Sequence, residues 1–299
     1  MISRKTFPRV LLFLAVFVFF SANTIYFLEA NPQLINGVYN KTFHFDFNHV
    51  RKGPYLNLKS ALLVNYENGE VLYAKNVDKP RSIASLSKLV SAMIVLDNKV
   101  DMNKTVKITR ADARQSSRSR LRVGYELTVN DLLHAALMNS DNRAVRALAR
   151  ATSGSIAEFS KEMNRKVKKM GLNKTYFYEP SGLDSRNIST AHEIALIIHH
   201  AYEYDLIRQI TSMKAYKVTI QNRKNKTLQM ANTNLLIYSR YKVETGKTGY
   251  TRAADYCLAT LIKNKKGERL TLIVLGVPGD RLRFKEARRL IDWGFKQIS

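Results

Sequence analysis

The chain has 299 residues, of which 45% are hydrophobic and 24% are charged, so it is long enough and apolar enough to fold as one large domain or as two lobes. Lysine and arginine number 49 against 24 for aspartate and glutamate, a net charge of +25 that predicts anionic partners: nucleic acid, acidic lipids or cell-wall polymers. The single cysteine, Cys257, excludes an internal disulfide, and its strand-like surroundings indicate a small core residue rather than a thiol nucleophile.

Residues 1–30 are typical of an export segment. Arg4, Lys5 and Arg9 are followed by eleven apolar residues, 10–20. Apolar character resumes after Asn23, and the whole stretch 10–28 is barely long enough to span a bilayer. A clear cleavage site with small residues is missing, so the segment is either a cleaved signal peptide or a retained membrane anchor. Export to the periplasm or another extracytoplasmic space argues against a nucleic-acid partner.

The next region, 31–57, is interpreted as a linker. Within it, 43–50 alternates aromatic and polar residues, which fits either an added edge strand or an adhesive spacer. Two β-prone runs over 61–76 then flank Asn68-Gly69 and predict a β-hairpin with a type I′ turn.

Helical patterns dominate the middle of the chain. Apolar spacing predicts a helix over 87–98, and mostly helical signals continue from 101 to 205. Thr128 followed by Asp131 resembles an N-terminal cap, and Gly171 is expected to stop an amphipathic helix.

The C-terminal part has mainly strand patterns. They predict a hairpin over 215–232, strands over 244–251, 256–264 and 269–277, and a final helix over 283–298.

The order of these elements predicts an α/β fold in two lobes. The two ends of a domain spanning 58–299 would build an α/β lobe, from about 58–100 and 235–299. The segment 101–234 would insert as a mainly helical lobe.

Three short strings carry chemistry-bearing residues. Ser85 and Lys88 form an S-x-x-K pattern, Ser140 to Asn142 form an S-x-N pattern, and Lys247 begins a K-T-G pattern. S-x-N is a weak signal, because two other segments also match it. K-T-G occurs once and S-x-x-K recurs only at 239–242, and the three strings in this order form a specific combination.

The spacing of Ser85 and Lys88 suits nucleophilic catalysis. A serine hydroxyl needs a base, and residues i and i+3 of a helix share a face, so Lys88 can accept the proton if it is neutral. Burial and a second cation, for which Lys247 is the candidate, both lower a lysine pKa. A helix N-terminus at Ser85 would also stabilise an oxyanion.

The second string favours a turn after a helical run. Ser, Asp and Asn prefer caps and turns, so Ser140 and Asn142 are expected to reach a cleft between the lobes. Ser140 would relay a proton to the leaving amine, and Asn142 would hydrogen-bond a substrate amide.

The third string lies on an expected edge strand. The Lys247 ammonium and the Thr248 hydroxyl suit a carboxylate, and Gly249 would leave room for substrate along the strand. The backbone N–H of Tyr250 would complete an oxyanion hole with that of Ser85. Taken singly, Lys88 could be a surface lysine, Ser140 and Asn142 a helix cap, and Lys247-Thr248 a solvated strand face. Ser87 is interpreted as a residue of the helix start.

These motifs resemble the penicillin-binding serine DD-peptidases, the D-alanyl-D-alanine carboxypeptidases and endopeptidases of low molecular mass. The resemblance covers about 58–295 and includes "SIASLSKLV", "LHAALMNSDNRA", "YEPSGLDSRN", "NTNLL" and "GKTGYT". It implies an antiparallel sheet packed by helices with a helical lobe beside it. It also implies that Ser85 is the nucleophile, Lys88 its base, and Lys247 the carboxylate-binding lysine.

Two features favour the endopeptidase branch over the carboxypeptidase branch. The strings around Ser140 and Glu179 look closer to endopeptidases, and the chain stops after "LIDWGF" without the C-terminal β-domain and membrane helix that many carboxypeptidases carry. The resemblance implies no cofactor, peptidoglycan peptides as substrate and β-lactams as covalent inhibitors.

Three alternatives stay open. A serine β-lactamase shares the motifs, but "EPSGLD" after Glu179 does not match the E-x-x-L-N pattern of the class A enzymes. A non-catalytic cell-wall-binding protein is disfavoured by intact Ser85 and Lys88. A charge-driven nucleic-acid binder is disfavoured by the export segment. The histidines show no H-E-x-x-H pattern, which argues against a zinc peptidase.

Overall fold

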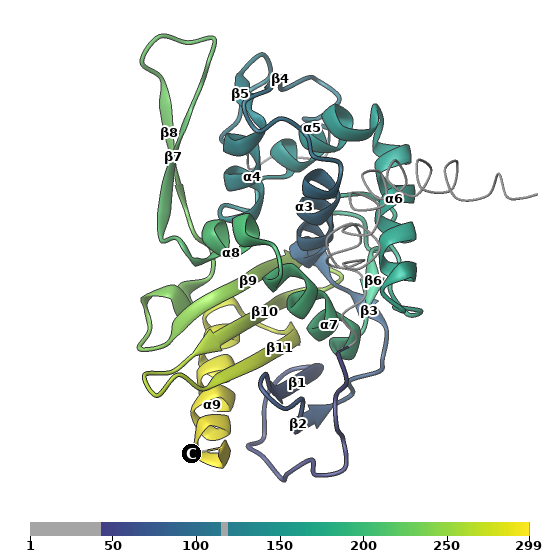
Figure 1. Cartoon of the computed structure of the whole chain (residues 1–299), viewed down its shortest axis with the longest axis vertical. Helices are drawn as coiled ribbons and strands as arrows, with labels where there is room; N and C mark the ends of the chain where they lie inside the picture. Colours follow the sequence, from purple (N-terminus) through teal and green to yellow (C-terminus); the bar gives the residue numbers. More distant parts are fainter. Residues whose placement is uncertain (1–42, 115–118, 299) are drawn as a thin grey trace, which may run out of the picture. The chain divides into compact units, whose positions relative to one another are not determined.

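The central element is a five-stranded antiparallel sheet. The computed structural model describes residues 43–114 and 119–298, and residues 43–299 form a compact unit of their own. The strands follow the order β2-β1-β11-β10-β9, which brings the two ends of the described chain together (Figure 1). Their bounds are β1 Ser60–Asn65, β2 Val71–Lys75, β9 Lys242–Thr251, β10 Asp255–Lys263 and β11 Arg269–Val277.

The sheet is covered by helices on both faces, which explains why its strands are nearly continuous apolar runs. Along β1, Leu62 packs into one hydrophobic cluster and its neighbour Leu63 into the other, on opposite faces of the sheet. Helix α9, Asp280–Ile298, covers the face of Leu63. Gly294 lets α9 approach closely, because a Cβ there would lie 2.3 Å from Leu63 Cδ2.

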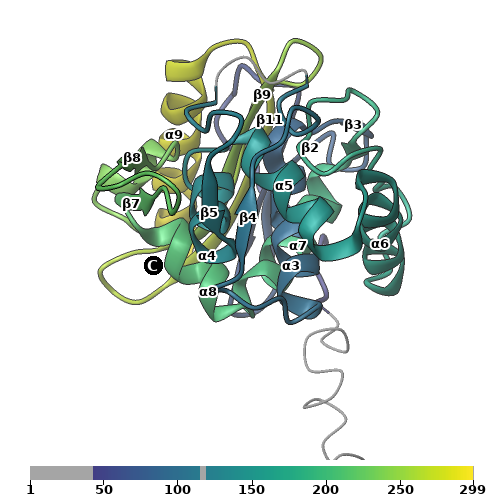
Figure 2. The same cartoon turned by 90° about the horizontal axis from the view of Figure 1, so that it is seen from above.

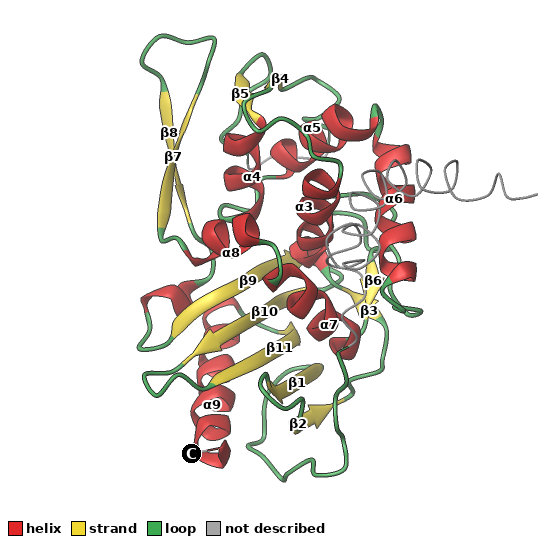
Figure 3. Cartoon of the chain, viewed as in Figure 1, coloured by secondary structure: helices red, strands yellow, loops and turns green. Residues whose placement is uncertain are grey.

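The other face carries the helical part of the unit, shown in red in Figure 3. Figure 2 gives the view from above, in which α5 lies between α4 and α6. The helices on this face are η1 Ala84–Ser87, α3 Lys88–Asp97, α4 Val129–Leu137, α5 Asn142–Ser153, α6 Ile156–Lys169, α7 Ala191–Tyr202 and α8 Asp205–Ser212. The short η2, Leu235–Tyr238, packs Leu236 into the cluster on the α9 face.

Side-chain caps fix where several of these helices begin. Thr128 accepts a hydrogen bond from the backbone N–H of Asp131, as the sequence predicts, and Asp141, Ser155 and Thr190 cap the helices that follow them in the same way. The predicted stop at Gly171 is also confirmed, since α6 ends just before it.

Three short antiparallel pairs lie outside the main sheet: β3 (Arg81–Ser82) with β6 (Ile188–Ser189), β4 (Thr105–Lys107) with β5 (Glu126–Thr128), and β7 (Ala215–Thr219) with β8 (Thr227–Ala231). The β7–β8 hairpin projects beyond the helices in Figure 1. The predicted hairpin over 215–232 is therefore confirmed.

The first hairpin is confirmed, but its predicted type I′ turn is wrong. Such a turn needs positive φ at both central residues, and only Gly69 has it. The chain instead makes a five-residue connection between β1 and β2, in which Gly69 N–H bonds to Asn65 O and the Asn68 side chain accepts the N–H of Glu70. His44 O would lie 2.3 Å from a Cβ at Gly69, so the preceding segment packs against this turn.

Residues 43–50 join the sheet through an isolated parallel bridge between Asp46 and Glu70. The apolar stretch 10–28 lies outside the described residues. Within 43–114 and 119–298, no helix combines the length and the apolar character that a membrane span requires.

Candidate active site

Ser85 lies in the tight turn that starts helix α3. Its neighbour Ala84 has φ 49°, a left-handed conformation that bends the chain sharply before η1. Lys88 follows one turn later and is 1% exposed. Its Nζ lies 2.8 Å from Ser85 Oγ, so the two side chains share a face as their spacing predicts.

Lys88 has two other polar partners, both neutral oxygens. Its Nζ donates to Asn142 Oδ1 at 2.7 Å and to the Ser181 carbonyl at 2.6 Å. Burial lowers the pKa of Lys88 to about 8, although the carboxylates of Glu179 and Asp141 act in the opposite direction. About a tenth of this amine is therefore neutral at pH 7 and can accept a proton.

Ser140 occupies a strained turn between α4 and α5, with φ 60°. Asp141 caps α5 through hydrogen bonds from the N–H groups of Arg143 and Ala144, and its second oxygen accepts the hydroxyl of Ser119 at 2.6 Å. This capping fixes Asn142 as the first residue of α5, where its side chain reaches Lys88.

Lys247 is buried on β9, which is an edge strand as predicted. Its Nζ donates to the Thr248 carbonyl at 2.9 Å. Burial, then the charges of Lys88 and Arg283, lower its pKa well below the usual value. Repulsion between the two ammonium groups is reciprocal, so Lys247 disfavours the charged form of Lys88 in the same direction, but burial is the largest cause of the lowered pKa of Lys88.

Gly249 has a packing role that the sequence did not indicate. A Cβ at this position would lie 3.0 Å from Ile83 O and 3.1 Å from Ser85 N. The glycine was expected to leave room for substrate, but here it lets β9 approach the turn that carries Ser85. The next residue, Tyr250, stacks on Tyr256 with ring centroids 4.2 Å apart.

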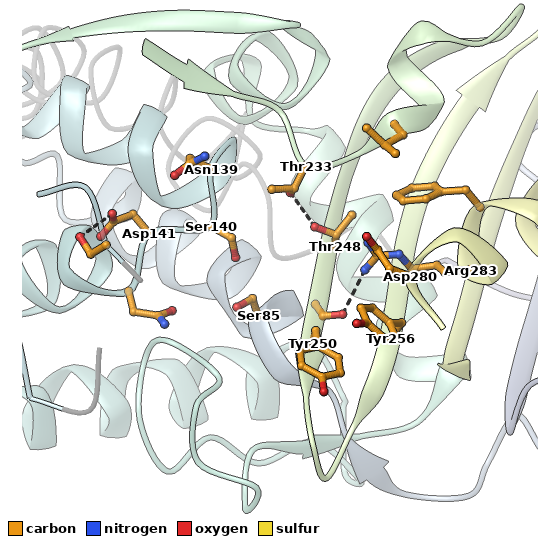
Figure 4. A pocket seen from close by; sticks show the side chains of 15 residues that line it. Ser85, Asn139, Ser140, Asp141, Thr233, Thr248, Tyr250, Tyr256, Asp280 and Arg283 are labelled. Atoms are coloured by element: carbon orange, nitrogen blue, oxygen red, sulfur yellow. Dashed lines mark hydrogen bonds and ion pairs between the residues drawn. The ribbon is translucent and has the colours of Figure 1, made fainter. Parts of the chain in front are cut away.

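These segments enclose a cavity of ≈ 580 Å³ (Figure 4). Ser85, Ser140 and Asn142 line its helical side, and Thr248, Gly249 and Tyr250 line its β9 side. The figure shows Ser140 beside Ser85, with Thr248 across from them. Lys88 and Lys247 are not among the lining residues but lie buried behind this wall.

The sequence analysis missed several residues of this cavity. Thr233 lines it, and its Oγ1 lies 2.6 Å from Thr248 Oγ1 and donates to Met138 O at 3.2 Å. Thr233 lies within the string "NTNLL", which is part of the resemblance to the family, but the sequence analysis assigned no role to it.

Asp280 and Arg283, from the first turn of α9, were also missed. Arg283 is 5% exposed and donates to the carbonyls of Gly249 and Cys257, at 3.2 and 3.0 Å, and to Asp280 Oδ1 at 2.5 Å. Nothing in the local pattern of α9 separates Arg283 from the other arginines of that helix.

Glu179 does not reach the cavity. Its Oε2 accepts the N–H and the hydroxyl of Ser181, at 2.8 and 2.6 Å, and its Oε1 accepts the N–H of Leu183 at 2.8 Å. Glu179 thus holds the loop whose Ser181 carbonyl contacts Lys88. A carboxylate engaged in this way is poorly placed to activate water, which weighs against the β-lactamase alternative.

Cys257 is buried, and burial raises the pKa of its thiol to about 11. Its prediction as a core residue is confirmed. Within the part of the chain that the structure describes, no three His, Cys, Asp or Glu side chains come together in a group that could hold a metal ion.

With this geometry in hand, comparison with known proteins identifies the family. Residues 48–279 match the model of the D-alanyl-D-alanine carboxypeptidase family. The chain belongs to this family of serine peptidases. The recognition from sequence, the enzyme class and the α/β fold class are therefore confirmed.

Relatives of both branches are similar to this chain. A D-alanyl-D-alanine endopeptidase of Escherichia coli is 36% identical over 80% of this chain and 78% of its own length. The carboxypeptidase DacF of Bacillus subtilis is 32% identical over 80% of this chain and 62% of its own length. Among solved structures, an ampicillin-bound penicillin-binding protein of Listeria monocytogenes has a TM-score of 0.72 and 31% identity, and covers 82% of this chain and 100% of its own.

Proposed function

We propose that this chain is an exported serine DD-peptidase that hydrolyses D-alanyl peptide bonds of peptidoglycan through an acyl-Ser85 intermediate. One observation carries the proposal: the Lys88 amine, with its pKa lowered to about 8, lies 2.8 Å from the hydroxyl of Ser85 at the wall of an open cavity. A buried lysine that contacts a hydroxyl, an amide oxygen and a carbonyl oxygen has the environment that a general base needs.

In the acylation step, Ser85 Oγ attacks the carbonyl carbon of the D-alanyl residue while its proton passes to neutral Lys88. The backbone N–H groups of Ser85 and Tyr250 would stabilise the oxyanion of the tetrahedral intermediate. When the C–N bond breaks, the leaving amine takes the proton that Lys88 received, relayed through the hydroxyl of Ser140, and Lys88 becomes neutral. The products of this step are the ester at Ser85 and the free amine.

In the second step, water attacks the ester carbonyl and gives its proton to Lys88, which is neutral again. The ester C–O bond breaks, and Ser85 Oγ recovers a proton. This sequence returns the enzyme to its starting state without a cofactor.

Substrate binding is assigned to both walls of the cavity. Asn142 would hydrogen-bond an amide of the acyl portion, and an extended peptide can align with edge strand β9. Lys247 and the Thr248 hydroxyl, with Arg283 close by, would attract the carboxylate of the leaving portion. Gly249 keeps β9 close enough to Ser85 for both walls of the cavity to contact the same peptide.

For the bond that is cut, we favour the cross-link between two stem peptides. Two relatives, at 36% and 34% identity, carry the name D-alanyl-D-alanine endopeptidase, and each is covered over more than three quarters of its length. The second candidate is removal of the terminal D-alanine, favoured by the similarity to DacF. The same proposal includes three further properties. They are location outside the cytoplasm, covalent inhibition by β-lactams, and attraction to anionic envelope polymers or lipids.

The test compares the full-length protein and its Ser85→Ala variant on cross-linked and uncross-linked muropeptides, with products identified by mass. Conversion of dimers to monomers is expected for the wild type and not for Ser85→Ala. Loss of only the terminal D-alanine would assign the carboxypeptidase branch instead. A fluorescent penicillin should label Ser85 stably, and fast turnover of the drug would overturn the proposal in favour of a β-lactamase.

A further inference from the structure

The positive charge of this chain is concentrated in a segment that the catalytic chemistry does not use. Between Asp205 and Glu244 there are eight lysine and arginine residues and no aspartate or glutamate. Five of the eight fall on the β7–β8 hairpin, its tip and the residue before it. They are Lys214, Lys217, Arg223, Lys224 and Lys226.

The hairpin presents these cations outward. Along β7, Tyr216 and Val218 are the more buried residues, while Lys217 between them is exposed. Arg223 and Lys224 are exposed at the tip, where the chain projects beyond the helices in Figure 1. The hairpin over 215–231 exposes no large hydrophobic side chain; the exposed Val123 and Met213 lie beside it, and cations outnumber them on this surface.

The neighbouring segment 119–126 adds two arginines to the same surface. The N–H of Gln221 bonds to the carbonyl of Glu126, and Asn222 bonds to Glu126 N–H and to Gly124 O, so the tip is fixed to this segment. Arg120 Nη1 donates to the Gln229 carbonyl at the side of β8. Arg122, the second arginine, is exposed.

Tyr125 marks the point where the cations converge. Lys226 Nζ lies 5.0 Å from the centroid of its ring. The pKa of the Tyr125 hydroxyl is lowered, first by a hydrogen bond with Lys226 and then by the charges of Lys226, Arg122 and Arg223. We call this surface, residues 119–126 together with the hairpin 214–231, the basic arm.

The acidic groups at the basic arm have partners other than Lys217, Arg223 and Lys224, and Asp131 is bonded to the hairpin itself. Asp131 accepts the Tyr216 hydroxyl and the Thr219 N–H, at 3.1 and 3.0 Å. Glu126 lies 3.9 Å from Lys107. Across residues 43–114 and 119–298, no ion pair with an acidic side chain is made by Lys217, Arg223 or Lys224.

The basic arm also borders the catalytic cavity. Ser119, at its start, lines the cavity, and so does Thr233, two residues beyond β8. At the base of the hairpin, Asn139 Nδ2 donates to the Ala231 carbonyl at 3.5 Å, and the N–H of Thr233 bonds to Met138 O. A polymer held by the arm therefore lies within reach of Ser85.

We propose that the basic arm is a second binding surface for the peptidoglycan polymer, where lysine and arginine side chains bind the free carboxylates of stem peptides beside the one being cut. This inference rests on the proposed function. The surface would hold the enzyme on the polymer and leave the reaction at Ser85 unchanged. Exposed charges attract through solvent, so the binding is sensitive to salt.

The experiment measures binding of the full-length protein to insoluble peptidoglycan at low and high salt. The test variant carries Lys217→Gln, Arg223→Gln and Lys224→Gln. The matched control carries Lys285→Gln, Arg288→Gln and Lys296→Gln, which removes two lysines and one arginine from exposed positions of α9. A second ligand is peptidoglycan whose carboxylates have been converted to amides. It tests whether binding requires the negative charge of those carboxylates.

We expect the arm variant to bind roughly tenfold more weakly at low salt, with the control close to wild type. Added salt or amidated peptidoglycan should lower the wild-type affinity to that of the arm variant. All three proteins should react equally with a fluorescent penicillin, because the substitutions lie outside the cavity. Failure of that labelling in the wild type would instead count against the proposed function.

Three results would overturn the inference. The arm variant could bind native peptidoglycan as tightly as wild type. The α9 control could lose as much affinity as the arm variant, which would show that binding depends only on the net charge of the protein. Lastly, the arm variant could lose binding only to vesicles of acidic phospholipid, which would make the partner a lipid surface.

Discussion

The two ends of helix α3 each hold a buried lysine, in opposite electrostatic settings. At its start, Lys88 contacts the Ser85 hydroxyl, the Asn142 amide oxygen and a backbone carbonyl. At its end, Asp97 pairs with Lys166 of α6 at 2.8 Å, and Tyr204 bonds to both. The Lys166 side chain is as well buried as Lys88, with 2% exposed.

Burial lowers the pKa of both lysines, but only Lys166 has a directly bonded carboxylate to oppose that shift. A carboxylate in hydrogen-bond contact holds an amine in its charged form, and a hydroxyl or carbonyl does so much less. The same residue type therefore ties α3, α6 and the α7–α8 connection together at one end of α3 and is available as a base at the other. The following predictions separate these two uses.

The largest effect is expected from Lys88→Met. This change removes the proton acceptor from Ser85 and should slow acylation by a fluorescent penicillin about 1000-fold, within the range for loss of general-base catalysis. The rate is measured by stopped-flow or gel labelling, with Ser85→Ala as the unlabelled control and circular dichroism to verify folding. A folded Lys88→Met protein that acylates within tenfold of wild type would show that Lys88 is not the base.

Lys166→Met should lower the stability of the protein and leave the acylation rate nearly unchanged, the opposite of Lys88→Met. It leaves Asp97 partly buried without its lysine, so the free energy of unfolding should fall by about 2–4 kcal/mol, a value reduced because the Asp97 side chain is 23% exposed. Acylation of the folded protein should stay within about twofold of wild type. Urea titration and penicillin labelling provide the two measurements, and a large loss of rate at unchanged stability would erase the contrast between the ends of α3.

The pH profile of acylation should follow the neutral form of Lys88. Its pKa is about 8, so the neutral fraction falls about tenfold for each pH unit below 8 and levels off above it. The second-order rate constant for penicillin should therefore rise by roughly two orders of magnitude from pH 6 to pH 8, and then flatten. A rate that is constant over this range would mean that Lys88 does not titrate there.

A smaller effect is expected at Thr233, which we interpret as a positioning residue. Thr233→Val removes the hydroxyl 2.6 Å from Thr248 Oγ1 and should raise KM for a carboxylate-bearing peptide about tenfold, with little change in kcat. Thr233→Ser keeps the hydroxyl and should behave as wild type. Equal losses in kcat for both variants would indicate general damage to the fold.

The sequence predicted those parts of the site that are encoded in local strings. Ser85 and Lys88 are one helical turn apart, so their contact follows from spacing. The edge position of Lys247 follows from the strand pattern of the C-terminal part and the resemblance to the family. The order of helical and strand elements also followed, because helical and strand periodicities change at clear points along the chain, while the division into two lobes stays a prediction.

The rest depends on contacts between distant segments. The Ser181 carbonyl and the Arg283 guanidinium meet the motifs only in the folded chain, and a backbone carbonyl has no signature in sequence. The packing role of Gly249 was missed for the same reason, since its neighbours Ile83 and Ser85 lie far away along the chain. The β1–β2 connection was predicted wrongly because Asn68-Gly69 was taken alone, without the Asn65 carbonyl that accepts the Gly69 N–H.

The most direct test is a measurement of the Lys88 pKa by NMR. Lysines labelled with carbon-13 at Cε are titrated in the wild-type protein, and the Lys88 resonance is assigned by its absence from the spectrum of Lys88→Met. A midpoint near pH 8, in a protein whose Ser85 is acylated by penicillin, is the expected result. A midpoint above pH 10 would mean that Lys88 stays charged at neutral pH and would contradict its role as the base.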